Sequence, residues 1–128
     1  MTFAQIAELH AVQALGAKEP ETSAASYRKG FDVIWQGRKI EVKSKEPPGR
    51  PVADSARYVN IHDSKRESDL FWFYLFETTP AALEVIEMAT TEVFSARVSR
   101  KGTAITIRDV RRRGRTIWKA GKCTRGNA

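Results

Sequence analysis

Seven consecutive apolar residues constrain the fold of this chain more than any other feature of its sequence. They run from Leu70 to Phe76 and read Leu-Phe-Trp-Phe-Tyr-Leu-Phe. A strand buried on one face alternates apolar and polar residues, so an unbroken apolar run predicts a strand covered on both faces. A buried helical segment could carry the same pattern, but the short length and aromatic content favour a strand. We therefore expect a central sheet with other elements packed on both of its faces.

Other parts of the chain have the local signatures of elements that could cover such a sheet. Thr2 and Gln5 have the spacing of a helix capping box, and Gln36-Gly37 separates two β-prone runs as a hairpin turn does. Between the regular elements we expect a polar connection over 17–27, a proline-rich loop over 47–51 and a turn over 78–82. The expected elements are a helix over 3–15, a hairpin of 31–35 and 40–44, strands over 57–62 and 83–88, a short helix capped by Thr90, and a basic hairpin of 103–110 and 116–119 around Gly114. This order predicts an α/β or α+β fold, with a central mixed sheet flanked by helices.

The length and the cysteine content place the chain in a broad class. A chain of 128 residues suits one domain, which we expect over residues 1–122, with 123–128 as a disordered tail. A single cysteine excludes a disulfide framework and favours a reducing compartment. The start of the chain does not resemble a signal peptide, and the apolar run is far shorter than the roughly 20 residues of a membrane helix. We expect a cytoplasmic protein without a membrane partner.

Positive charge accumulates toward the end of the chain. The sequence has 22 Lys and Arg against 15 Asp and Glu, a net charge of +7, and residues 95–128 alone hold eleven bases and one acid. A basic surface of this kind favours a phosphate backbone as partner, although a solvated basic tail would have the same composition. No glycine-rich phosphate loop is present, so a nucleotide or another small-molecule cofactor is not expected. The residues expected to contact nucleic acid are Lys45, Lys65, Arg66, Arg111, Arg112, Arg113, Arg115 and Lys119.

The first hairpin brings acidic and basic side chains together. If it turns through Gln36-Gly37, paired residue numbers sum to 73, and Asp32 lies opposite Glu41. The side chains of directly opposed residues in a hairpin lie close together, so the two carboxylates would repel each other. A divalent cation such as Mg²⁺ would offset that repulsion. Lys43 follows Glu41 by two residues and projects from the same face. The alternative is a solvent-facing strand with ordinary charge pairs, and a one-residue change in register would separate the two acids.

The same residues resemble the signature of the PD-(D/E)XK nuclease superfamily. Asp32, eight intervening residues and then Glu41-Val42-Lys43 match an acidic residue on one strand followed by Glu-x-Lys on the next. The resemblance implies that Asp32, Glu41 and the Val42 carbonyl bind Mg²⁺, with Mn²⁺ as a substitute, and that Lys43 positions or activates water. Many members also place a glutamate on the first helix, and Glu8 matches it. The resemblance covers roughly residues 5–95 and implies a restriction-endonuclease-like core: a helix, a three-stranded hairpin sheet, a helix and a further strand.

The sequence departs from this family pattern in several places. Phe31, and not proline, precedes Asp32; a proline-rich loop interrupts the chain after the signature; and the basic hairpin near the C-terminus does not belong to the common core. These differences bear on the subfamily and the substrate more than on the class of reaction.

Together these observations predict a metal-dependent DNA endonuclease that hydrolyses phosphodiester bonds. Within that class, a resolvase of branched DNA such as a Holliday junction would act as a homodimer, because two symmetric sites can cut two strands. A general nickase and a phage or restriction-type nuclease fit the same residues. Two alternatives stay open: a nucleic-acid-binding module of the same fold with inactive carboxylates, and a component of a nucleoprotein assembly whose basic end binds a protein.

Overall fold

The strand at the centre of the fold is β4 (Leu70–Phe76), and all seven of its residues are buried. The structure is a computed structural model that describes residues 1–20, 31–47, 52–77, 83–98, 102–119 and 122–123. The expected connections therefore lie wholly or largely outside the described residues: most of 17–27 and 47–51, and all of 78–82. The prediction that residues 70–76 form a strand covered on both faces is confirmed.

A six-stranded mixed sheet surrounds β4, with the strand order β1-β2-β4-β5-β7-β8. The strands β2 and β4 are parallel, whereas the other neighbouring pairs are antiparallel. The bounds of the other strands are β1 Val33–Trp35, β2 Arg38–Lys45, β5 Leu83–Ala89, β7 Arg115–Lys119 and β8 Lys122–Cys123.

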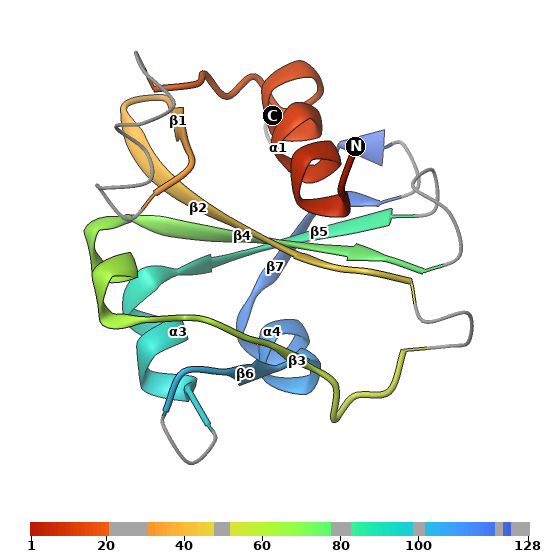
Figure 1. The fold of residues 1–128 in the computed structure, drawn as a ribbon, viewed down its shortest axis with the longest axis vertical. Coiled ribbons are helices and arrows are strands. Elements are labelled where there is room, and N and C mark those ends of the chain that lie inside the picture. Colours follow the sequence, from red (N-terminus) through yellow and green to blue (C-terminus); the bar gives the residue numbers. More distant parts are fainter. Residues whose placement is uncertain (21–30, 48–51, 78–82, 99–101, 120–121, 124–128) are drawn as a thin grey trace.

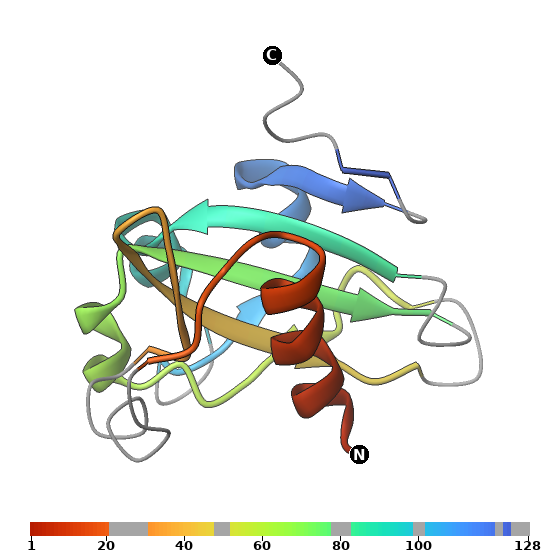
Figure 2. The same cartoon turned by 90° about the horizontal axis from the view of Figure 1, so that it is seen from above.

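Different elements cover the two faces of the sheet (Figure 1). Helix α1 (Phe3–Gln13) packs on one face, where Ala7 and Ala11 join a core with Trp72 and Tyr74, and Figure 2 shows it lying over β2 and β4. The other face carries α3 (Thr90–Ala96), α4 (Ile107–Arg113) and a small sheet of β3 (Arg57–Tyr58) with β6 (Ile105–Thr106). The expected α+β class, with a central mixed sheet flanked by helices, is confirmed.

The first hairpin forms in the predicted register. Gln36 and Gly37 have φ values of 48° and 76°, as the central residues of a type I′ turn require. Val33 pairs with Ile40 and Trp35 with Arg38, so paired residue numbers sum to 73. The turn fixes this register over three residue pairs, and Asp32 lies just before the first paired residue of β1.

The expected strand over 57–62 is largely wrong. Only Arg57 and Tyr58 form a strand, and they pair with β6 outside the central sheet. Asn60 adopts a left-handed backbone with φ of 62°, which ends the extended conformation before the 3₁₀ helix η1 (Asp63–Glu67) begins. Alternation of polar and apolar side chains over so few residues does not distinguish a strand from an extended loop with one buried side.

The expected hairpin of 103–110 and 116–119 is also wrong in its first half. Residues 105–106 form β6, and a helix, α4, then runs from Ile107 to Arg113. The Thr106 hydroxyl accepts a hydrogen bond from the Asp109 amide at 3.2 Å, so Thr106 caps this helix. Ile107 and Val110 are buried three residues apart, a helical spacing that was read as a β-prone run. The second half, as β7, is confirmed.

Four smaller differences concern the ends of elements and the order of strands. Helix α1 ends at Gln13 rather than residue 15, and the N-cap of α3 is Ala89, while Thr90 is its first residue. The strand after β2 in the sheet is β4, parallel to it, in place of the third strand of a hairpin sheet. Cys123 belongs to β8, and the remainder of the expected tail, 124–128, lies outside the described residues.

Among the described residues, no helix has the length and apolar character needed to cross a membrane.

We predict that Gly114→Ala destabilises the protein by about 1–3 kcal/mol, because it overpacks the contact between α4 and β5. A methyl group at this position would lie 2.5 Å from Ile86 Cγ2 and 2.6 Å from the Val110 carbonyl oxygen. Urea unfolding followed by circular dichroism would measure the change. The matched control is Arg112→Ala on the exposed side of α4, expected to stay within about 0.5 kcal/mol. Equal midpoints for wild type and Gly114→Ala would contradict the packing described here.

Candidate active site

Asp32 and Glu41 meet at the start of the first hairpin. The Asp32 amide donates to the Ile40 carbonyl at 2.8 Å, one residue before the β1–β2 register begins at Val33 with Ile40. The Asp32 carboxylate in turn accepts a hydrogen bond from the Val42 amide at 2.8 Å. These two contacts place the Asp32 side chain along the edge of β2, close to the carboxylate of Glu41.

Glu41 is a buried carboxylate whose charge is only partly balanced by neighbouring ammonium groups. The residue is 2% exposed, because it lies beside Phe71 of β4 on the face that α3 covers. Its Oε2 atom is 3.2 Å from Lys65 Nζ and 3.6 Å from Lys43 Nζ. When Glu41 is ionised, its Oε1 atom has no hydrogen-bond donor among the described residues, whereas the protonated carboxyl group can form a side-chain hydrogen bond with Asp32. Burial, followed by the charge of Asp32, raises the pKa of Glu41 to about 8.

Lys43 projects from the same face as Glu41, as the sequence predicted. Its ammonium group donates a hydrogen bond to the Asn60 carbonyl at 3.1 Å as well as contacting Glu41. Burial lowers the pKa of Lys43 from its ordinary value, and the nearby Glu41 opposes that shift. The Lys43 ammonium is therefore held between β2 and the segment that leads to η1.

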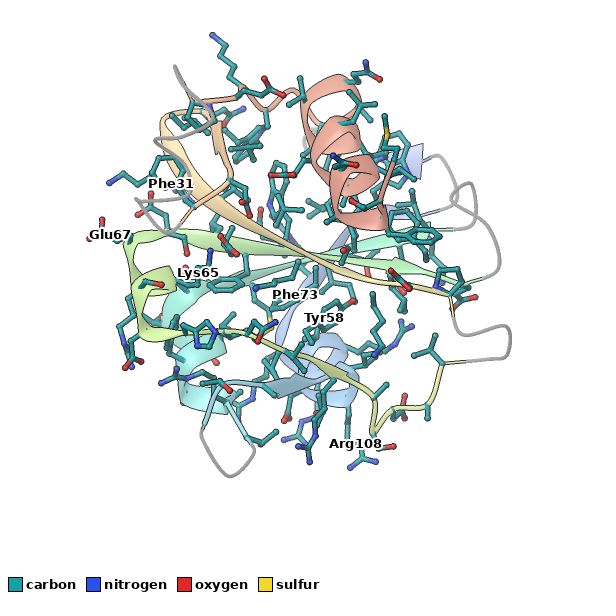
Figure 3. The ribbon with its side chains drawn as sticks, viewed as in Figure 1. Phe31, Tyr58, Lys65, Glu67, Phe73 and Arg108 are labelled. Atoms are coloured by element: carbon teal, nitrogen blue, oxygen red, sulfur yellow. The ribbon has the colours of Figure 1, made fainter. Side chains whose placement is uncertain are left out.

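Lys65 approaches Glu41 from a different element, η1. Figure 3 shows its side chain reaching from this 3₁₀ helix toward the sheet. The sequence analysis assigned Lys65 and Arg66 only to nucleic-acid contact, because no local pattern links residue 65 with the hairpin. The structure places the Lys65 ammonium nearer to Glu41 than the Lys43 ammonium is.

A set of contacts fixes η1 and hence Lys65. Arg66 and Arg97 both lie over the Phe94 ring, at 4.2 and 4.3 Å from its centroid. Arg97 also forms an ion pair with Asp63 at 3.2 Å, and Ser68 Oγ donates to the Lys65 carbonyl at 2.7 Å. Arg66, which was expected to contact nucleic acid, thus lies against α3 in this structure.

Glu8 approaches the site from α1 on the opposite face of the sheet. Burial, then the charge of Asp32 and a side-chain hydrogen bond with Asp32, raises the pKa of Glu8 to about 7. Glu8 and Asp32 line a hollow of about 520 Å³ together with Glu19. The helical glutamate predicted for the site is therefore beside Asp32, and the site lies at the edge of the sheet where the two covering layers meet.

Three arginines of the C-terminal region, Arg111, Arg113 and Arg115, lie elsewhere, over β5 and α3. They form ion pairs with Glu84, Glu87 and Glu92 and do not contact the two carboxylates of the hairpin. The pairs are Arg111 with Glu84 at 2.6 Å, Arg113 with Glu92 at 3.3 Å and Arg115 with Glu87 at 3.4 Å. Arg112 and Lys119 are exposed. Binding of nucleic acid by these residues stays a prediction.

The residues around Glu41 fit a hard divalent cation. Mg²⁺ is commonly held by one or two carboxylates, with waters and substrate oxygens completing its coordination. The buried Glu41 Oε1 lacks a partner, and the Val42 amide already points to Asp32, so the Val42 carbonyl projects to the same side of the strand. The described residues contain no group of three or more His, Cys, Asp or Glu side chains suited to a metal, so two carboxylates and one carbonyl form the available set.

Comparison with known proteins adds no family assignment. No protein-family model matches the chain, and a search of curated proteins found no match.

We predict that the metal-free protein loses stability as the pH rises from about 4.5 to about 8, and that Glu41→Gln removes much of this loss. Because the pKa of Glu41 is about 8 when folded and 4.5 ordinarily, the folded state in this window holds a proton that the unfolded chain has released. Stability therefore falls with rising pH until the folded carboxylate ionises as well. The raised pKa of Glu8 acts in the same direction up to about 7.

Urea unfolding in EDTA, at steps across this pH window, would measure the difference. We expect the wild type to fall relative to Glu41→Gln by a few kcal/mol. Glu67→Gln is the matched control, because Glu67 is exposed and points away from the protein (Figure 3); this variant should keep the wild-type profile. Parallel profiles for wild type and Glu41→Gln would refute the burial of an uncompensated carboxylate.

Proposed function

We propose that this protein is a metal-dependent endonuclease that hydrolyses phosphodiester bonds in DNA, of the PD-(D/E)XK type. One observation carries the proposal: the buried Glu41 carboxyl group lies beside Asp32, and burial, the charge of Asp32 and a side-chain hydrogen bond with Asp32 together hold its pKa well above the ordinary value. A protein that used these residues only for stability would gain by replacing a buried, unmatched carboxylate with a neutral or apolar residue. Retaining two close acids at a cost in stability is typical of a site that binds a cation or performs acid–base chemistry.

Asp32, Glu41 and the Val42 carbonyl would hold the cation. When bound there, Mg²⁺ or Mn²⁺ would polarise a phosphate oxygen and lower the pKa of a coordinated water. The hydrogen bond from the Val42 amide orients the Asp32 carboxylate, so this ligand is positioned before any metal binds. The enclosed position of Glu41 strengthens its attraction for a cation because little water screens it.

The two lysines have separate roles in this proposal. Lys43 holds and orients the attacking water by donating a hydrogen bond, since its ammonium is already fixed between Glu41 and the Asn60 carbonyl. Lys65 stabilises negative charge that develops on the phosphate oxygens. Both ammonium groups are partly enclosed, with side chains that are 17% and 22% exposed.

Glu8 completes the set from the α1 side. With a pKa near neutrality and a contact with Asp32, it can take or release a proton close to the hairpin at physiological pH. Branched DNA, cut by a homodimer with two symmetric sites, is the substrate that we propose within this class.

The first test is a cleavage assay on supercoiled plasmid and on a four-way DNA junction, with Mg²⁺, Mn²⁺ or EDTA. We predict cutting with either metal and none in EDTA. Asp32→Asn, Glu41→Gln and Lys43→Ala should each reduce the rate by about 100-fold or more. Arg38→Ala is the matched control, because Arg38 is an exposed cation at the hairpin turn of the same strand.

Two outcomes would count against the proposal. Cutting that is unchanged in Glu41→Gln and Lys43→Ala would place the active site elsewhere. No cutting with any metal, alongside salt-sensitive DNA binding, would favour the nucleic-acid-binding module with inactive carboxylates, because phosphate contacts weaken steeply with salt.

We further predict that Lys65→Ala lowers kcat by about tenfold or more while leaving KM within about twofold. Lys65 contacts Glu41, so its removal affects the reacting groups more than substrate binding. Lys65→Arg should recover part of the rate, since it keeps the charge. Steady-state kinetics on the junction would separate the two constants, and a rise in KM with kcat unchanged would show that Lys65 serves binding alone.

A further inference from the structure

A second hollow runs along the open edge of β2. The register of the hairpin stops at Val33 with Ile40, so beyond Ile40 the strand has a described strand neighbour only on the β4 side. Along this edge the protein forms a groove of about 570 Å³. Its lining comes from residues 42–47 of β2 and the loop after it, residues 57–60 on the opposite wall, and Ala4 of α1.

Long-range contacts hold the two walls of this groove in place. Lys43 Nζ donates to the Asn60 carbonyl at 3.1 Å and Lys45 Nζ to the Arg57 carbonyl at 3.4 Å. The Tyr58 hydroxyl donates to the Tyr74 carbonyl at 3.1 Å and ties the opposite wall to β4. Arg57 and Tyr58 also pair with β6. The groove is therefore defined by the fold and not by a single loose loop.

The charge of the groove is positive and that of the first hollow is negative. Lys43, Lys45 and Arg57 line the groove together with one acid, Glu46. Among the described residues that line the hollow beside Glu8, Glu19 and Asp32 are acidic and none is Lys, Arg or His. A polyanion that approaches Glu41 is thus attracted along the groove and repelled from the other hollow.

The backbone adds a hydrogen-bond donor to this surface. The Val42 amide points outward to Asp32, and residues two apart on a strand present their amides to the same side. The Ser44 amide therefore faces the open edge between Lys43 and Lys45. An ammonium carries three N–H donors, and the contact with Arg57 uses one of those of Lys45.

We propose that this groove, between β2 residues 42–46 and residues 57–60, binds the phosphate backbone of the DNA strand that enters the active site. The inference rests on the proposed nuclease function and specifies the path of its substrate. Lys43 lies at both the groove and the carboxylates, so a strand in the groove leads directly to the reacting groups. Recognition through phosphates makes this binding independent of sequence.

The test is DNA binding in EDTA, measured by fluorescence anisotropy with a labelled duplex and a labelled four-way junction over a range of salt. The double variant Lys45→Gln/Arg57→Gln should weaken binding by about tenfold or more and reduce the slope of log K against log salt by about 2. Arg38→Gln, on the same strand outside the groove, is the control and should bind as the wild type does. Thermal unfolding of each variant verifies that it is folded.

The C-terminal arginines supply the competing outcome. Arg112→Gln removes an exposed cation of α4 that the sequence predicts to contact nucleic acid, and the groove proposal expects a smaller loss of affinity from it than from the double variant. Wild-type affinity in the double variant, or an equal loss in Arg38→Gln or Arg112→Gln, would overturn the proposal.

The same variants separate the groove from the chemistry. Cutting with unchanged KM in the double variant would reject the groove and leave the nuclease proposal standing. Weaker binding in the double variant, with no cutting by the wild type in any metal, would reject the nuclease and leave the groove as a phosphate-binding site. A raised KM with kcat nearly unchanged is the result that supports both.

Discussion

The burial of β4 on both faces is the constraint on which the other elements depend. An apolar strand without a polar face cannot lie at the surface, so the chain must supply a layer on each side. Helix α1 forms one layer, and α3, α4 and the small β3–β6 sheet form the other. Because β2 pairs in parallel with this strand, Glu41 and Lys43 lie beside Phe71 and Phe73. The charged side chains of β2 are partly enclosed because the strand that bears them pairs with the buried strand β4.

That enclosure gives the candidate site its electrostatic character. A carboxylate at the surface keeps its ordinary pKa and binds cations weakly, whereas Glu41 is shielded from water and lies beside Asp32. The ammonium groups of Lys43 and Lys65 offset part of the cost but leave one oxygen without a partner. The site is therefore poised for a cation, and the protein tolerates lower stability there, as functional sites commonly do.

Much of the hairpin could be predicted from sequence because its determinants are local. Gln36-Gly37 sets the turn, and the turn sets the register that pairs Val33 with Ile40. Asp32 lies just beyond this register, where bonds to the Ile40 carbonyl and the Val42 amide hold it near Glu41. The role of η1 could not be predicted, because Lys65 is 24 positions from Glu41 and only the packing of Arg66 and Arg97 on Phe94 brings it there. Helix α4 could not be predicted for another reason. It has seven residues, too few for the spacing of its apolar side chains to distinguish a helix from a strand, and its clearest local signal is the Thr106 cap.

The sequence by itself determined the buried strand, the hairpin and its register, and the projection of Lys43 from the same face as Glu41. These features follow from turn chemistry, from side-chain periodicity and from the apolar run, all of which act between near neighbours. Only the tertiary structure decided that Lys65 joins Glu41 and that a basic groove opens along β2. These features depend on contacts between segments that are distant in sequence. The packing of the whole fold sets which segments meet, so no single segment carries a pattern that predicts the contact.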